Sequence, residues 1–147
     1  MDALGQMVGE EVVRVAGKID RMTPVARIEA AERVVTCPTK PPTRQREGAS
    51  TVRAEKLDLH LGLVMINQIA LTSVSGEVLT NIYWHLRKVS PLANTIMITM
   101  ANDRVGYIPD DAAYDTPYFE VTGSPLQKGC AETAIVSGLV DMIGRFR

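Results

Sequence analysis

Two oxygen-bearing side chains stand at corners of the chain, each just after an apolar run that reads as a strand. Glu77 follows the run 69–74 directly after a glycine, and Tyr107 lies in the turn after the run 95–101. A helix between the two runs would make them parallel neighbours. Ligands of open α/β sheets bind at the carboxyl ends of parallel strands. The spacing therefore predicts that the carboxylate and the phenol converge at one edge of a sheet.

Glu77 also has plainer interpretations. It could be a solvated surface charge, or an acid in the first turn of the following helix, stabilised by about 0.3–1 kcal/mol through the helix dipole. The two histidines suggest no alternative site. His60 falls on the polar half of an alternating strand, which predicts a solvent-facing or sheet-packing residue. His85 lies off the apolar stripe of its helix, which predicts a surface or interface residue.

The amino-acid composition limits the classes of protein to which this chain can belong. The chain has 147 residues, 46% of them hydrophobic, and a formal net charge of −1, which is typical of a single globular domain or a domain fragment. The near-zero charge argues against nucleic acid as a partner, and no apolar run reaches the ~18 residues of a membrane span. The acidic N-terminus does not resemble a signal peptide. Cys37 and Cys130 form no metal-binding pair, and we expect two free buried thiols, with a disulfide as the alternative in an exported protein.

The periodicity of apolar residues predicts the elements of the first half. A helix is expected over 3–19, and 25–36 favours a strand over a helix. The segment 37–50 is rich in proline and basic residues and predicts a solvated loop, in which Lys40, Arg44 and Arg46 could meet an anion. Strict alternation over 57–63 predicts a half-buried strand that continues into a hairpin turning at Asn67-Gln68.

The second half continues with a helix over 78–89 and a largely buried strand in "NTIMITMAN" (94–102), then a turn with one short helical piece. A short strand is expected over 117–123, followed by a helix over 130–146. This order predicts an α+β or α/β fold, a mixed sheet with helices packed on it.

Three stretches carry a more specific signal: "INQIALTSVSGEVLT", "SPLANTIMITMANDRVGYIPDDAAYD" and "YFEVTGSPLQKGCAETAIVSGLVDMI". Together they resemble the C-terminal part of the catalytic domain of the neutral/alkaline (non-lysosomal) ceramidases, and most closely its bacterial relatives. The resemblance is strongest over 53–143, and the helix at 3–19 is compatible with it.

The resemblance implies a zinc amidase that hydrolyses the N-acyl bond of ceramide-type lipids. The family's glutamate and tyrosine zinc ligands match Glu77 and Tyr107. It also implies a partial piece of a layered α/β/β/α domain. Zinc in such a site would activate water against the amide carbonyl. The residues expected to shape the site are Gly76, Asn102, Gly106 and Asp110.

The departures from the family pattern matter equally. The family's two zinc histidines and its serine, arginine and histidine cluster come from segments N-terminal to this region, and neither His60 nor His85 matches them; Ser75 replaces a common proline. We therefore expect half a zinc site, with no catalytic residue in this chain. Activity on an N-acyl lipid would need a complementary N-terminal segment. The alternatives are a non-catalytic oligomerising or binding domain that keeps the fold with a dead site, and an unstable remnant that self-associates.

Overall fold

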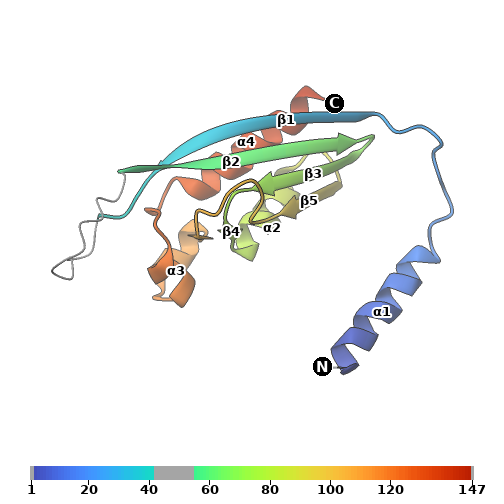
Figure 1. Ribbon diagram of the computed structural model, residues 1–147, viewed down its shortest axis with the longest axis horizontal. Coiled ribbons are helices and arrows are strands. Elements are labelled where there is room, and N and C mark those ends of the chain that lie inside the picture. Colours follow the sequence, from blue (N-terminus) through green and yellow to red (C-terminus); the bar gives the residue numbers. More distant parts are fainter. Residues whose placement is uncertain (1, 42–54, 147) are drawn as a thin grey trace.

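The computed structural model describes residues 2–41 and 55–146, and its centre is a mixed four-stranded sheet in the order β1-β2-β3-β5 (Figure 1). The first three strands pair antiparallel, and β3 pairs with β5 in parallel. Helices pack on this sheet, so the predicted α+β fold is confirmed. The strands span Ile28–Pro38 (β1), Lys56–Ile66 (β2), Ile69–Val74 (β3) and Asn94–Ile98 (β5).

The hairpin between β2 and β3 forms where the sequence predicts it. Ile66 pairs with Ile69, and Asn67 occupies the turn with a φ of 52°. This is the left-handed region, which asparagine tolerates better than most residues with a side chain. The expected strand within 25–36 is also confirmed, since β1 begins at Ile28.

One face of the sheet is covered by two helices, α2 (Thr80–Val89) and α4 (Ala131–Arg145), of which α4 lies along the sheet in Figure 1. Every second residue of β2 faces these helices, so Leu59, Leu61 and Leu63 are buried, whereas His60 and Val64 on the other face are exposed. The chain passes from β3 through α2 to β5, which confirms the predicted crossover between parallel strands. The residues at the centre of this core are Leu59, Leu61, Leu63, Ile82, Leu86, Ile135, Leu139 and Ile143.

A second, two-stranded parallel sheet lies beyond the ends of β3 and β5. It consists of β4 (Glu77–Val78) and β6 (Tyr107–Ile108). A 3-10 helix, η1 (Asp111–Asp115), follows β6 and corresponds to the short helical piece that was expected.

The short strand predicted over 117–123 is wrong, because this stretch forms the helix α3 (Phe119–Gly123). The hydroxyl of Thr122 donates to the backbone oxygens of Tyr118 and Phe119, which satisfies carbonyls within the turn. Val121 is buried, and the Phe119 ring meets Tyr107 edge-on at 5.9 Å. Tertiary contacts on one side of a helical turn thus override the strand preference of the aromatic and β-branched residues.

The N-terminal helix α1 (Asp2–Ala16) forms as predicted but stands apart from the body of the molecule (Figure 1). None of its described side chains is buried. The segment expected as a loop over 37–50 begins differently: Cys37 and Pro38 complete β1, and Thr39 bridges to Leu126. The rest of that prediction, with Arg44 and Arg46, lies outside the described residues from position 42 on.

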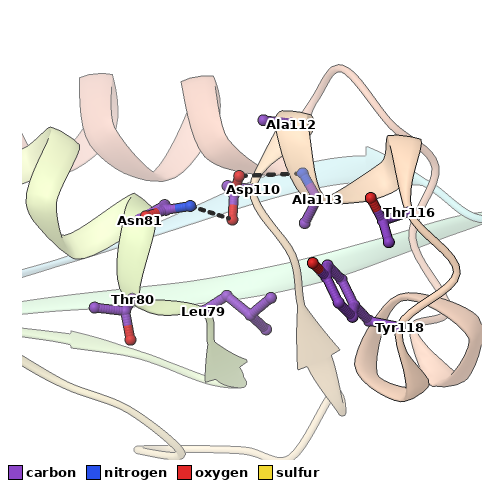
Figure 2. Close-up of a pocket in the computed structure, with 8 residues that line it drawn as sticks. All are labelled: Leu79, Thr80, Asn81, Asp110, Ala112, Ala113, Thr116 and Tyr118. Atoms are coloured by element: carbon purple, nitrogen blue, oxygen red, sulfur yellow. Dashed lines mark hydrogen bonds between the residues drawn. The ribbon is translucent and has the colours of Figure 1, made fainter.

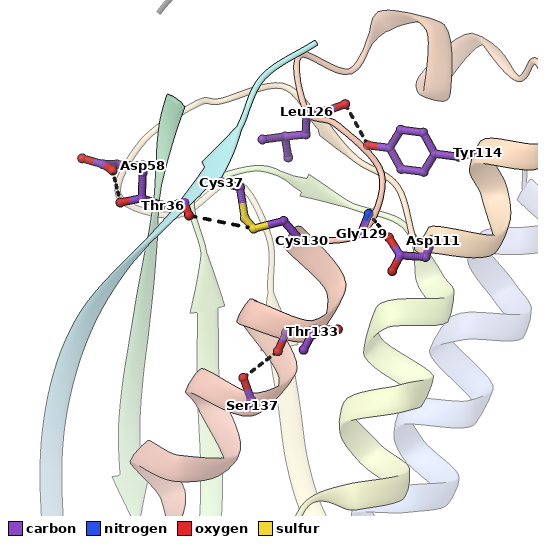
Figure 3. The surroundings of a disulfide bond; sticks show 10 residues. All are labelled: Thr36, Cys37, Asp58, Asp111, Tyr114, Leu126, Gly129, Cys130, Thr133 and Ser137. Atoms are coloured by element: carbon purple, nitrogen blue, oxygen red, sulfur yellow. Dashed lines mark hydrogen bonds between the residues drawn. A yellow bond between two sulfur atoms is a disulfide. The ribbon is translucent and has the colours of Figure 1, made fainter. Parts of the chain in front are cut away.

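The expectation of two free thiols is wrong, because Cys37 and Cys130 form a disulfide bond (Figure 3). Cys37 is a core-facing residue at the end of β1, and Cys130 immediately precedes α4, so the fold brings their Cα atoms to 5.8 Å. That separation lies within the usual range for bridged cysteines. The bond fixes the start of α4 to the edge of the sheet.

Across the described residues, none of the helices combines the length and apolar character that crossing a membrane requires.

Candidate metal centre

Glu77 and Tyr107 are directly opposite each other in the small parallel sheet, where Glu77 pairs with Tyr107 and Val78 with Ile108. Residues in register on adjacent strands lie on the same side of a sheet, with the strands about 4.8 Å apart. Ile108 is fully buried, whereas Glu77 is exposed and Tyr107 half-buried. The register therefore places the Glu77 and Tyr107 side chains on the same, outward side of the sheet.

Gly76 allows this sheet to form. A Cβ atom at this position would lie 2.5 Å from the Ile108 side chain and 2.9 Å from the backbone oxygen of Gly106. Gly106 itself has a φ of 89°, a conformation that side chains disfavour. The two glycines thus let the backbones approach, so that the amide of Glu77 donates to the carbonyl oxygen of Gly106 at 2.9 Å.

Glu77 does not lie in the first turn of α2, because the helix begins at Thr80 after an extended Leu79. Glu77 is therefore not an acid in the first turn of α2, where the helix dipole would stabilise its charge. Within the described part of the chain, its carboxylate makes no hydrogen bond or ion pair, so the charge is available to a ligand.

Tyr107 is held from two directions. The hydroxyl of Ser124, which is buried, donates to the backbone oxygen of Tyr107 at 2.8 Å. The Phe119 ring contacts the Tyr107 ring edge-on, with an interplanar angle of 76°. The Ser124 bond holds the backbone of Tyr107 and the Phe119 contact restricts its ring, while Tyr107 remains partly accessible.

Asp110 shapes the segment after β6, as Figure 2 shows. Its carboxylate is only 3% exposed, accepts from the backbone amide of Ala113 at 3.2 Å, and accepts from the Asn81 side chain at 3.3 Å. It thereby caps η1 and ties this helix to the first turn of α2. Asp110 borders an open pocket of about 410 Å³ that begins at Leu79, two residues beyond Glu77.

Asn102 lies elsewhere than its predicted role implies. It has a φ of 65° and lines a pocket of about 190 Å³ together with His60 and Glu32, on the sheet face away from α4. A Cβ on Gly62 would lie 3.9 Å from its side-chain nitrogen. None of the described contacts joins Asn102 to Tyr107, so it does not hold the tyrosine directly.

Sequence reasoning missed a polar link between α2, α4 and η1. Glu132 accepts from the amide of Asp111 at 2.9 Å, and its other oxygen lies 2.7 Å from Nδ1 of His85. The hydrogen bond from Asp111, and secondarily the proximity of His85, lowers the pKa of Glu132 despite opposition from burial. The position of Glu132 in the first turn of the last helix is the one signal that could have indicated it.

The donor chemistry fits two positions of a zinc site, since carboxylate and phenolate oxygens are acceptable zinc ligands. Among residues 2–41 and 55–146, no three His, Cys, Asp or Glu side chains gather as a metal-binding group. Glu77 and Tyr107 therefore fit half of a coordination sphere, and the remaining ligands would have to come from elsewhere. No protein-family model matches this chain, and a search of curated proteins finds no significant match.

Proposed function

We propose that this chain is the C-terminal part of a ceramidase-like zinc amidohydrolase, in which Glu77 and Tyr107 are two of the zinc ligands. One observation carries the proposal: the two residues pair directly across parallel strands β4 and β6. Glu77 and Tyr107 are distant in the sequence, so their pairing comes from the tertiary fold and not from local chain geometry. The arrangement is what the family resemblance requires of these positions.

The chain's own residues would act by placing the two oxygens. Gly76 and Gly106 permit the close approach of β4 and β6, and buried Ile108 anchors the inner side of the sheet. Contacts from Phe119 and Ser124 restrict Tyr107, which lowers the entropy lost when its oxygen binds a ligand. Zinc, when bound, would supply the Lewis acidity that activates water and polarises an amide carbonyl.

The other half of the site would come from a complementary N-terminal segment that carries the histidines. A catalytic zinc usually has three protein ligands, and the described residues supply two suitable ones at this sheet. The substrate proposed from the resemblance is an N-acyl lipid. An open pocket begins at Leu79, two residues beyond Glu77, but neither Glu77 nor Tyr107 is among its lining residues.

The disulfide supports action in an oxidising compartment. Such bonds persist in secreted, periplasmic and cell-surface proteins and are rare where glutathione keeps thiols reduced. The bridge between Cys37 and Cys130 is therefore compatible with export of the protein.

Zinc affinity tests the half-site. We expect weak zinc binding by the isolated chain, measured by calorimetry, and at least about a tenfold loss, or about 1.4 kcal/mol, in Glu77→Gln and in Tyr107→Phe. Glu32→Gln and Tyr83→Phe are controls on other surfaces, because Glu32 is exposed on β1 and the Tyr83 hydroxyl on α2 donates to the backbone oxygen of Thr95. Equal zinc affinity in all five proteins would contradict the proposal.

Reconstitution tests the activity. Adding a histidine-bearing N-terminal segment of a ceramidase-like domain should tighten zinc binding and produce hydrolysis of a fluorogenic N-acyl amide. Glu77→Gln should abolish that hydrolysis, while Glu32→Gln should retain it. Tight zinc binding by the isolated chain that the added segment leaves unchanged would show that this chain does not carry half a site.

The second candidate is a non-catalytic binding or oligomerising domain that keeps the fold with a dead site. The exposed apolar sheet face described below favours it. This alternative predicts that Glu77→Ala leaves both folding and partner binding unchanged. Loss of a metal-dependent amidase activity in Glu77→Ala would eliminate it.

A further inference from the structure

The helix α1 carries an apolar stripe that contacts nothing in the described part of the chain. Leu4 and Val8 remain 68% and 65% exposed, and Val12 is 61% exposed. Amphipathic helices of globular proteins normally bury such a stripe. An isolated helix of 15 residues is also marginally stable in water without a packing partner. The apolar residues on this side are Leu4, Met7, Val8, Val12, Val15 and, just beyond the helix, Ile19.

The sheet has a matching exposed surface on the face away from α2 and α4. The register aligns Ala30, Val64, Leu71 and Ile96 across all four strands as one continuous row. Val64 is 38% exposed and Ile96 is 47% exposed. We call this surface the open face; its apolar residues are Ile28, Ala30, Val34, Val64, Ile66, Ile69, Leu71, Ile96 and Ile98.

The chain between α1 and β1 is held at the end of the sheet where the β2-β3 hairpin turns. The Asn67 side chain accepts from the amide of Arg27 at 2.9 Å and donates to the carbonyl oxygen of Val25 at 3.3 Å. Pro24 disfavours a helical turn at Thr23, so the chain leaves the sheet in an extended course. Figure 1 shows α1 at the end of this extended segment, beyond the edge of the sheet.

We propose that α1 of one copy packs on the open face of a second copy, and that the exchange is reciprocal. Each unpartnered apolar surface would then cover the other without any change in the course of the chain near Asn67. Reciprocal exchange makes a closed two-fold dimer, the commonest symmetric assembly. The six apolar residues of the stripe and the nine of the open face make up half to three quarters of the roughly 20–30 residues that each partner contributes to a standard stable interface.

The dimensions agree with this arrangement. A helix of 15 residues is about 22 Å long, because each residue adds about 1.5 Å. Four strands at about 4.8 Å spacing give a sheet about 14 Å across between its outer strands. One helix laid across the strands can therefore cover the aligned apolar rows. The inference stands on these surfaces and does not depend on the proposed zinc chemistry.

Sedimentation over a concentration range gives the first test. The intact chain should sediment as a dimer of twice 16.1 kDa. Val12→Glu on the stripe and Ile96→Glu on the open face should each raise the dissociation constant at least tenfold. Gln6→Glu and Thr133→Glu add the same charge at exposed positions outside both surfaces and should leave the dimer intact. A monomeric intact chain would overturn the proposal. The same holds for a monomer in which hydrogen exchange shows the α1 amides protected, because α1 would then pack on the sheet of its own copy.

Mixing the two weakened variants gives the sharper test. A mixed dimer of Val12→Glu with Ile96→Glu retains one unaltered helix and the unaltered open face that receives it. The mixture should therefore dimerise more tightly than either variant alone. If the dimer instead joined two open faces directly, mixing would restore nothing, and that result would refute helix exchange. At a dilution where the intact chain is monomeric, Val12→Glu should unfold at the same temperature as the intact chain, because α1 does not contact the body of its own copy. This result verifies that the variant folds.

Discussion

The two faces of the central sheet are built from the same alternating strands but have opposite environments. On the face toward α2 and α4, Leu61 and Leu63 are at most 2% exposed, while Val64 on the other face of the same strand is 38% exposed. The alternation therefore places apolar residues on both faces, and only one is covered within the described residues. The difference teaches that α2 and α4 complete the burial of the covered face, whereas the open face would need a further surface, for which we propose the α1 stripe of a second copy.

Removing the disulfide should have the largest effect, because it fixes α4 over the covered face. Cys37 and Cys130 are separated by 93 residues, and the chain-entropy model gives about 4 kcal/mol or more for a closed loop of this order. We expect the double variant Cys37→Ser with Cys130→Ser to lose about 2–5 kcal/mol of unfolding free energy in urea titrations.

Reduction provides the control for that prediction. Dithiothreitol should destabilise the native chain by a similar amount and leave the double serine variant unaffected. A native chain that unfolds at the same urea concentration with and without reductant would show that the bond contributes nothing to holding α4.

A pair of neighbouring substitutions on β2 tests the two faces directly. Leu63→Ala on the covered face should cost about 2–5 kcal/mol, because it leaves a cavity against the helices. Val64→Ala on the open face should cost under about 1 kcal/mol in a dilute monomer, where water already reaches the side chain. Chemical denaturation of both variants measures the contrast.

Protein concentration sharpens this comparison. If α1 of a second copy covers the open face, Val64→Ala should cost more unfolding free energy as the dimer forms. The difference in cost between Leu63→Ala and Val64→Ala should therefore become smaller at higher protein concentration. Similar costs for the two variants in dilute monomer would mean that the open face is buried by other means.

The smallest effect is expected at the polar link on the covered side. Glu132→Gln should cost about 1 kcal/mol near neutral pH, because the hydrogen bonds from Asp111 and His85 lose their charge assistance. The pKa of Glu132 is lowered in the folded chain, mainly by the Asp111 amide. Its ionised form therefore stabilises the fold above the usual glutamate pKa of about 4.3, and this stabilisation is lost as the pH falls through the folded pKa.

Stability measured against pH checks the sign of this effect. The difference in unfolding free energy between the native chain and Glu132→Gln should be largest above about pH 5 and should fade toward pH 3. A difference that instead grew as the pH falls would contradict the assigned role of the carboxylate.

Most of the fold could be predicted from the sequence because the relevant signals are local. The alternation over 57–63, the hairpin at Asn67 and the stripe of the last helix each depend on residues close in the chain. The strand predicted over 117–123 failed because the contact of Phe119 with Tyr107 and the burial of Val121 are tertiary. The disulfide remained only an alternative for an exported protein, since spacing alone cannot indicate whether two distant cysteines meet.

The candidate site was partly predictable. The pairing of Glu77 with Tyr107 follows the predicted crossover, because strands that end at one edge bring their following residues together. The position of Asn102 on the open face was not predictable, since a left-handed residue in the turn redirects the chain there. The link through Glu132 joins three elements, and sequence periodicity contains no information on such a meeting.

The disulfide has one further consequence, for the covalent connectivity of a nicked protein. Cys37 and Cys130 enclose β2, β3, both strands of the small sheet, and the pair Glu77 and Tyr107. A protease that cuts once anywhere between the two cysteines would leave both products joined, so no peptide would dissociate until the bond is reduced. By contrast, a single cut in the segment 17–27 would leave α1 with no covalent link to the rest of the chain, because the disulfide does not span that segment, and only non-covalent packing could then retain the helix.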